Sequence, residues 1–228
     1  MIAEVFPEAY DTKGRTTFRP DQRKRGHFRS TFPIGRYLSQ PLTVECKNLE
    51  GLRSFLRKCR PVSDEDQFGV PDYWVPPDEF ERSRKGDCED FSLYAWRQLL
   101  AMGYSARFVG GRAGRYGEGH AWVTFEEHGK TFLLETQECW LGPRFARLST
   151  LRYKPAVSVE WDGKKVHFYK HEERKFTPPI QQIPWLVAEW FYYEARFFLR
   201  VAYAVPVRLA KLVYRKLRRV IKTDSQAR

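Results

Sequence analysis

The chain has 228 residues, of which 30% are charged and 16% aromatic, and its formal net charge is +12. This length allows one hydrophobic core with extensions, and the composition is that of a globular protein rather than a disordered or fibrous one. No stretch of about 18 uncharged apolar residues occurs, so no ordinary membrane-spanning helix is expected. The basic surface would attract an anionic membrane, a nucleic acid or an acidic partner.

The cysteine pattern indicates free thiols. The four cysteines are Cys46, Cys59, Cys88 and Cys139. Their spacing matches no zinc ribbon and no CxxC redox motif. The first ten residues lack the apolar run of a signal peptide. We therefore expect a cytoplasmic protein in a reducing compartment. Peripheral attachment of this protein to a membrane is compatible with that location.

Changes in composition divide the chain into three segments. Residues 1–45 alternate arginines with aromatic residues and prolines, and they are predicted to be a basic irregular arm. Contact of this arm with nucleic acid is disfavoured, because charged runs are usually solvated. Residues 46–176 are predicted to be the globular domain, and residues 177–228 a helical extension rich in aromatic and basic residues.

The C-terminal extension has a helical pattern over residues 185–222, which Pro206 should kink or split. Basic residues recur along one stripe, and apolar residues lie beside it. A basic amphipathic helix with aromatic residues is typical of a membrane surface or a partner-binding element. Residues 184–222 are therefore predicted to bind an anionic membrane or a protein partner. The alternative is packing on the chain's own domain or on a second copy.

The central segment combines helical and strand patterns. Helices are predicted over residues 47–59, 78–84 and 88–103. Strands are predicted over residues 105–110, 119–125, 131–135, 157–161 and 165–169. Two of the connections, residues 126–130 and Asp162-Gly163, have the composition of hairpin turns. The order predicts an α+β fold in which a helix packs on an antiparallel sheet.

Cys88 is predicted to stand at the first position of its helix. Asp87 has a side chain that can cap the helix, and Asp90 lies three residues further on. Unpaired N–H groups and the helix dipole at this position favour a thiolate. The helical period places Cys88 at the N-terminal end of the buried face.

A histidine and a glutamate lie at suitable positions on the predicted sheet. His120 opens the second of the five strands, and Glu135 ends the third. A two-residue or a four-residue hairpin loop puts both on one face, opposite or diagonal to each other and within side-chain reach. Since Cys88 is on the buried face of the helix that covers this sheet, the three side chains are predicted to converge.

A set of short motifs makes this pattern specific. They are residues 74–80, Gly86-Asp87-Cys88-Glu89-Asp90-Phe91, Gly103-Tyr104, Gly119-His120-Ala121-Trp122-Val123 and Leu134-Glu135-Thr136. Over about residues 70–140 the chain resembles the transglutaminase-like cysteine peptidase superfamily, most closely the bacterial transglutaminase-like cysteine proteinases. The resemblance implies a papain-like α+β core, Cys88 as nucleophile and His120 as base. Glu135 takes the place of the family's usual aspartate.

The expected function is hydrolysis of an amide bond, in a peptidase acting on a protein or peptide. An amine could instead take the acyl group, as in a transglutaminase or amidase. A non-catalytic scaffold acting through its C-terminal helix is the other alternative. Gln137 is a substitute for Glu135, and Trp74 or Tyr73 is a candidate oxyanion donor beside the Cys88 N–H. No cofactor is expected, although some family members bind calcium through carboxylates that correspond to Asp87 and Glu89.

Overall fold

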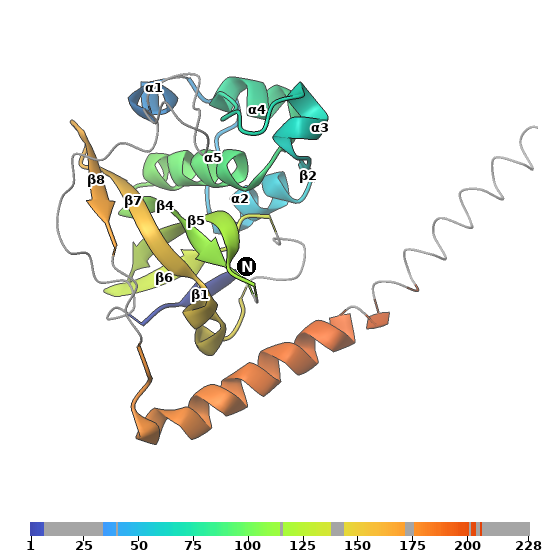
Figure 1. Ribbon diagram of the computed structural model, residues 1–228, viewed down its shortest axis with the longest axis vertical. Coiled ribbons are helices and arrows are strands. Elements are labelled where there is room, and N and C mark those ends of the chain that lie inside the picture. The colour runs from blue at the N-terminus through green and yellow to red at the C-terminus, as the bar shows by residue number, and fades with distance from the viewer. Residues whose placement is uncertain are drawn as a thin grey trace, which may run out of the picture.

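The computed structural model describes residues 1–6, 34–39, 41–114, 116–137, 144–171, 176–200, 202–203 and 206. It has a six-stranded antiparallel sheet in the order β1-β6-β5-β4-β7-β8, with the long helix α5 on one face (Figure 1). The strands are β1 Ile2–Glu4, β4 Ala106–Ala113, β5 Glu118–Glu127, β6 Lys130–Leu134, β7 Lys154–Trp161 and β8 Val166–Lys170. This mixed arrangement of helices and antiparallel strands confirms the predicted α+β class.

Shorter elements surround α5, which spans Cys88–Ala101. The other helices are α1 Ile34–Ser39, α2 Leu49–Leu56, α3 Asp64–Phe68 and α4 Pro77–Ser83, with the 3₁₀ helices η4 Arg147–Arg152 and η5 Ile180–Gln182. A small parallel pair joins β2 Arg60–Pro61 to β3 Lys85–Gly86. The predicted helices thus form, and α3 is an addition in a segment predicted to be a loop.

The beginning of the chain differs from the predicted irregular arm. Strand β1 pairs with β6, with Ile2 opposite Leu134, and its side chains Ile2 and Ala3 are buried. Helix α1 is also ordered, and its Tyr37 hydroxyl donates to the Trp74 carbonyl at 2.6 Å. The prediction is wrong at these two elements, because a three-residue edge strand is too short to produce an alternating pattern. Residues 7–33, with most of the arginine-rich sequence, lie outside the described residues.

The β5–β6 hairpin has the shorter of the two predicted loops. Glu127 pairs with Lys130, and the two turn residues His128 and Gly129 have φ values of 52° and 72°. These left-handed values are those of a two-residue hairpin turn that matches the twist of its strands. The register places Val123 opposite Leu134, so Glu135 follows directly after the end of β6.

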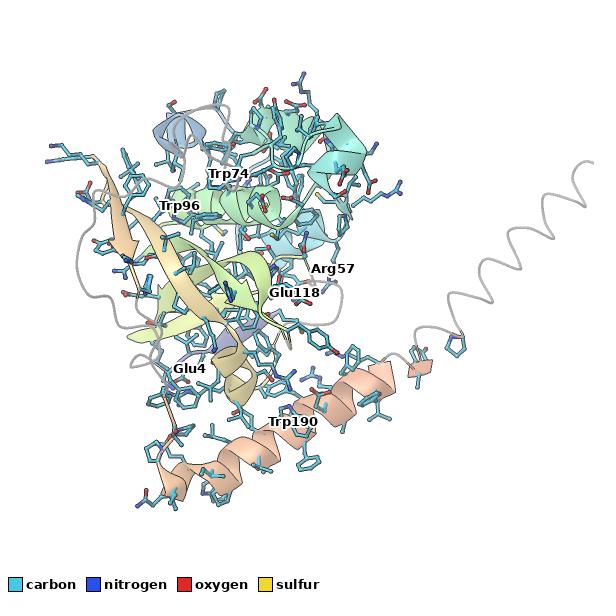
Figure 2. All side chains as sticks on the ribbon, in the orientation of Figure 1. Glu4, Arg57, Trp74, Trp96, Glu118 and Trp190 are labelled. Carbon is cyan, nitrogen blue, oxygen red and sulfur yellow. The ribbon has the colours of Figure 1, made fainter. Side chains whose placement is uncertain are left out.

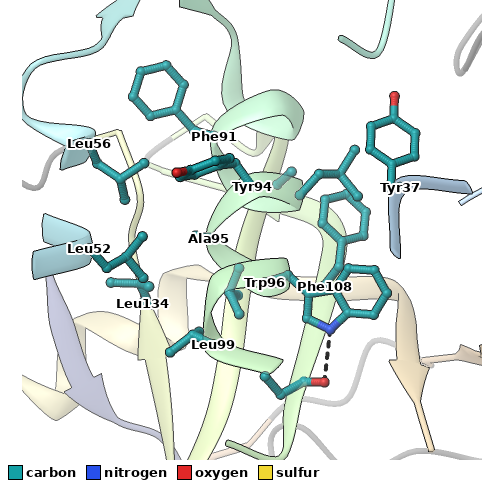
Figure 3. Packing of buried hydrophobic residues seen from close by; sticks show 14 of the residues in the cluster. Tyr37, Leu52, Leu56, Phe91, Tyr94, Ala95, Trp96, Leu99, Phe108 and Leu134 are labelled. Atoms are coloured by element: carbon teal, nitrogen blue, oxygen red, sulfur yellow. Dashed lines mark hydrogen bonds between the residues drawn. The ribbon is translucent and has the colours of Figure 1, made fainter. Parts of the chain in front are cut away.

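The main hydrophobic core lies between α5 and the sheet. Alternation along β5 turns Ala121, Val123 and Phe125 toward this core. Figure 3 shows Trp96, Leu99, Phe108 and Leu134 packed around the helix, and Trp96 Nε1 donates to the Ala106 carbonyl at 3.0 Å. Trp122 belongs to a second cluster on the opposite face, with Val5, Val109 and Leu133.

The turn before α5 is closely packed around a buried carboxylate. Asp90 accepts the backbone N–H of Val75 at 2.7 Å and that of Asp87 at 3.2 Å. A Cβ added at Gly86 would lie 2.7 Å from the Asp90 Cβ. Glycine is therefore required here by space, and Asp90 is held by the backbone on both sides.

Replacing Gly86 with alanine is expected to lower the free energy of unfolding by about 1–3 kcal/mol, because the added methyl group displaces Asp90. Denaturant unfolding measures the change. Gly35→Ala is the matched control, since a Cβ there meets nothing within 4 Å. Equal stability of the two variants would show that Asp90 can move freely.

Residues 183–200 form a helix that runs beneath the domain (Figure 1). Leu186 is buried against the domain, whereas the opposite face carries exposed apolar side chains. They are Trp185, Val187, Phe191, Tyr192, Phe198, Leu199 and Tyr203. No helix among the described residues is long and apolar enough to cross a membrane. Residues 207–228, with much of the predicted basic stripe, lie outside the described residues, so the basic amphipathic character of the extension stays a prediction.

Candidate active site

Cys88 begins α5 and is half-buried at the edge of the main core. Its sulfur forms a hydrogen bond with Glu89 Oε2 at 3.0 Å. The backbone N–H of Ala121, on β5, also interacts with the sulfur. The predicted position at the helix N-terminus is thus the observed one, and the thiol lies beside the residue that follows His120.

The surroundings of Cys88 oppose its ionisation in this structure. Burial raises the pKa of the thiol far above its ordinary value, and the carboxylates of Glu89 and Asp87 raise it further. The Ala121 N–H acts in the opposite direction by stabilising the thiolate. Formation of a nucleophile at neutral pH therefore requires a base at hand or neutralisation of these carboxylates.

His120 and Glu135 form the closest polar pair of the site. His120 Nε2 lies 2.7 Å from Glu135 Oε2, and the Tyr153 hydroxyl donates to the same oxygen at 2.8 Å. The backbone N–H of Gln137 donates to Glu135 Oε1 at 3.2 Å. Burial alone would raise the pKa of Glu135, but the hydrogen bond and charge of His120, with the Tyr153 hydroxyl, bring it below its ordinary value. These contacts therefore favour the carboxylate form of Glu135 next to the imidazole.

The thiol and the imidazole approach β5 from different sides. Helix α5 covers the face of Ala121 and Val123, whereas His120 shares the opposite face with Trp122. Convergence on the helix-covered face, as the sequence analysis expected, is thus not observed. The register with β6 ends at Val123, so no described strand lies beside His120 on that side. His120 therefore stands at the edge of β5, directly before Ala121, whose N–H interacts with the Cys88 sulfur.

A second contact ties the helix to the segment that carries the glutamate. Ser92, one turn after Cys88 on α5, is hydrogen-bonded to Thr136 at 3.0 Å between the two hydroxyl oxygens. Both residues are fully buried. The contact fixes the N-terminal half of α5 relative to Glu135, so the Cys88 and Glu135 backbones are held by one rigid framework.

A known family model matches the part of the chain that carries Cys88, His120 and Glu135. Residues 44–140 match the family model described as bacterial transglutaminase-like cysteine proteinase, a segment of less than half of the chain. Over this segment the chain is similar to the transglutaminase-like cysteine peptidases. The match includes Cys88, His120 and Glu135, and it extends the resemblance of residues 70–140 toward the N-terminus. A comparison with curated proteins gives no match.

Several solved structures are similar to this chain, among them the following three. The EGTA-treated LapG of Legionella pneumophila has 19% sequence identity and a TM-score of 0.42, and covers 72% of this chain and 81% of that one. Its calcium-bound form has 18% identity and a TM-score of 0.42, with 68% and 83% covered. A candidate cysteine protease from Cytophaga hutchinsonii has 16% identity and a TM-score of 0.36, with 64% and 51% covered. Scores this low carry no argument about activity or ligands.

The structure separates the other predicted site residues. Gln137 lies in a cavity of about 220 Å³ that His120, Glu135 and Tyr153 also line. Trp74 is fully buried in the core against Phe108, and Tyr73 packs on Phe68. Neither lines this cavity, so the prediction of an oxyanion donor at these two positions is not supported by their place in the fold.

Tyr153 is a site residue that the sequence analysis missed. It lies between η4 and β7, and its ring packs edge-on against Trp122 with centroids 5.2 Å apart. It belongs to no motif, because its contacts with Glu135 and Trp122 join residues that lie far apart in the sequence. The one sequence feature that could have pointed to Tyr153 is its position, as a polar aromatic residue, shortly before a predicted hairpin.

Five carboxylates gather around the N-terminus of α5. Ligand atoms of Asp64, Asp87 and Asp90 lie within 4.8 Å of one another, as do those of Asp64, Asp72 and Glu89. Burial and like charges raise the pKa of Asp87 to about 9 and that of Glu89 to about 7. Asp64 Oδ1 and Asp87 Oδ1 are buried and accept no hydrogen bond in the described part of the chain. These hard oxygen atoms fit a divalent cation such as calcium.

Proposed function

We propose that the chain cleaves peptide bonds with Cys88, His120 and Glu135, through a thioester acyl-enzyme. His120 takes the proton of Cys88, and the sulfur attacks the carbonyl carbon of the substrate. The C–N bond then breaks as His120 returns the proton to the leaving amine. Water, deprotonated by His120, hydrolyses the thioester. The observation that carries this proposal is the buried His120–Glu135 pair beside a cavity and next to the strand residue that meets the sulfur.

The glutamate has a defined part in this mechanism. Because Nε2 of His120 is bonded to Glu135, Nδ1 is the ring nitrogen that would accept the thiol proton. The carboxylate stabilises the imidazolium that results, while the Tyr153 and Gln137 donors hold the carboxylate in place. The longer glutamate side chain is accommodated because Glu135 is diagonal to His120 rather than opposite it.

Cleavage of a peptide library tests the proposal. The wild-type chain and Cys88→Ala are incubated with the library, and new amino termini are mapped by mass spectrometry. The wild-type chain alone is expected to produce them. A fluorescent primary amine in a parallel reaction separates hydrolysis from acyl transfer, since its incorporation into peptides would show a transglutaminase. New termini produced equally by the Cys88→Ala variant would refute Cys88 as the nucleophile.

We propose that calcium, where present, is held by the carboxylates that flank Cys88. Asp87 and Glu89 would be ligands, with Asp64 as a third, because the ligand atoms of these residues lie close together. One oxygen each of Asp64 and Asp87 is also buried without a hydrogen bond among the described residues. The bound ion supplies positive charge next to the thiol. In its absence Glu89 and Asp87 keep the pKa of Cys88 high.

This arrangement predicts that stability without calcium falls as the pH rises. The folded Asp87 and Glu89 titrate near 9 and 7, whereas their unfolded values are 3.8 and 4.5. The folded state therefore holds protons that the unfolded state releases between about pH 4 and 9, and it loses stability through this window. Thermal unfolding in EGTA should show a falling Tm, and calcium at about 100 times its Kd should raise the Tm by about 5–10 °C above pH 7.

The variant Asp87→Asn with Glu89→Gln is the control for this prediction. It should lose both the pH dependence and the response to calcium, since the carboxylates responsible are absent. A response of the double variant equal to that of the wild-type chain would place the cation elsewhere.

A second role is favoured by the exposed face of the helix over residues 183–200. We propose that Trp185, Phe191, Phe198 and their neighbours contact an anionic membrane surface, aided by the basic sequence that follows. Binding to phosphatidylserine vesicles measures this contact. Trp185→Ser with Phe198→Ser should weaken it at least about tenfold, and equal binding by the variant would exclude this face as the contact.

A further inference from the structure

A larger cavity, of about 380 Å³, lies between the C-terminal helix and the segment from Arg144 to Tyr153. In Figure 2, side chains of the domain extend toward this helix, on which Trp190 is labelled. Four arginines line the cavity: Arg144 and Arg152 from the domain, and Arg196 and Arg200 from the helix. We refer to it as the arginine cavity.

The arginine cavity is strongly positive. Glu194 is the one carboxylate residue among its described lining residues. Within the described part of the chain, no carboxylate forms an ion pair with Arg144, Arg152 or Arg196. A guanidinium group without such a partner can bind a carboxylate through two parallel N–H donors, which a lysine ammonium group cannot do. The positive charge of the cavity lining therefore favours binding of an anionic ligand.

Aromatic rings accompany these charges. Phe145, Tyr153, Tyr193 and Phe197 contribute to the walls of the arginine cavity. Such a mixture of rings and cations suits a ligand that alternates apolar and acidic groups, because rings bind apolar side chains and also stack on guanidinium planes. The volume is within the range of sites that enclose several ligand groups.

The arginine cavity adjoins the cavity of the proposed active site. Gly114 and Tyr153 line both. The Tyr153 hydroxyl donates to Glu135 at 2.8 Å, so this side chain lies between the arginines and the His120–Glu135 pair. An extended polypeptide that places its carbonyl group near His120 can therefore place a neighbouring residue among the arginines.

We propose that the arginine cavity binds an acidic segment of the polypeptide substrate, with acidic side chains close to the cleaved bond and an aromatic or aliphatic residue beside them. This inference rests on the proposed peptidase function, because the acidic segment is a substrate only if the chain cleaves peptides. The C-terminal helix is then part of the binding site, since Arg196, Arg200 and Phe197 come from it.

Binding without catalysis tests this proposal. The full chain carrying Cys88→Ala is titrated with the fluorescein-labelled peptide Gly-Phe-Glu-Glu-Phe-Gly and with its neutral counterpart Gly-Phe-Gln-Gln-Phe-Gly, and anisotropy is measured. The acidic peptide is expected to bind at least about tenfold more tightly, and the preference should shrink with added salt. Equal affinity of the two peptides would overturn the proposal.

Charge reversal identifies the residues. Arg152→Glu with Arg196→Glu should remove the preference for the acidic peptide. Lys164→Glu with Lys170→Glu is the matched control, because it changes the net charge equally on the exposed β7–β8 hairpin and should keep the preference. An equal loss in both variants would assign the effect to net charge and overturn the proposed site. Because the assay needs no cleavage, its failure is distinct from a failure of Cys88 to hydrolyse peptides.

Discussion

Replacing Cys88 with alanine is expected to reduce peptide hydrolysis to the uncatalysed background, a loss of at least about 10⁴-fold in kcat/KM. In the proposed mechanism the sulfur of Cys88 is the atom that forms the thioester. Alanine removes the sulfur and keeps the helix start, so the Tm should change by only a few degrees. Initial rates on a peptide cleaved by the wild-type chain measure the effect.

The control for this variant is a cysteine with a structural role. Cys59 is buried, and its sulfur lies 3.6 Å from the Phe55 carbonyl. Cys59→Ala should lower stability by about 1–2 kcal/mol and leave the activity per folded molecule unchanged. If Cys88→Ala retained the wild-type rate, the proposed mechanism would be refuted.

Replacing Glu135 with glutamine is expected to lower kcat by about 10²–10⁴-fold, with a smaller change in KM. Glutamine can still contact His120, but it carries no negative charge that would stabilise the imidazolium. Its amide nitrogen is a donor, so it cannot accept from Tyr153 or from the Gln137 N–H where it replaces a carboxylate oxygen. The lowered pKa of Glu135 indicates that the carboxylate is charged where His120 needs it. Steady-state kinetics on the folded variant measure the effect.

Two milder variants separate charge from position. Glu135→Asp keeps the negative charge but shortens the side chain by one methylene group, which moves the carboxylate away from His120. A loss of kcat smaller than that of Glu135→Gln is therefore expected. Tyr153→Phe removes one donor to the carboxylate and should cost about tenfold or less in kcat. Wild-type kcat in Glu135→Gln would show that the His120–Glu135 pair has a structural role alone.

Local chemistry made the beginning of α5 predictable. The Asp87-Cys88-Glu89-Asp90 sequence at a helix start fixed the place of the thiol, and Asp90 indeed accepts the Asp87 N–H. The parity of the β5–β6 hairpin was also sufficient to bring His120 and Glu135 together, because both candidate loops lead to the same face.

Features that depend on distant pairing were not predictable. Parity along β5 does not say which face the helix covers, and α5 lies on the Ala121 face because that face supplies the larger apolar surface. Likewise, Asp64 approaches Asp87, and Asp72 approaches Glu89, only through the path of the segment around α3. Tyr153 contacts Glu135 on the face of the sheet that carries Trp122, and the two residues are 18 positions apart in the sequence.

The rate at which iodoacetamide alkylates each cysteine, followed by mass spectrometry in calcium at pH 6–7, tests the central claim most directly. Cys46, Cys59 and Cys139 serve as internal references in the same molecule. An activated Cys88 should react much faster than all three, and His120→Ala should remove this advantage. Equally slow alkylation of the four cysteines, or a fast Cys88 that is unaffected by His120→Ala, would contradict a nucleophile activated by the His120–Glu135 pair.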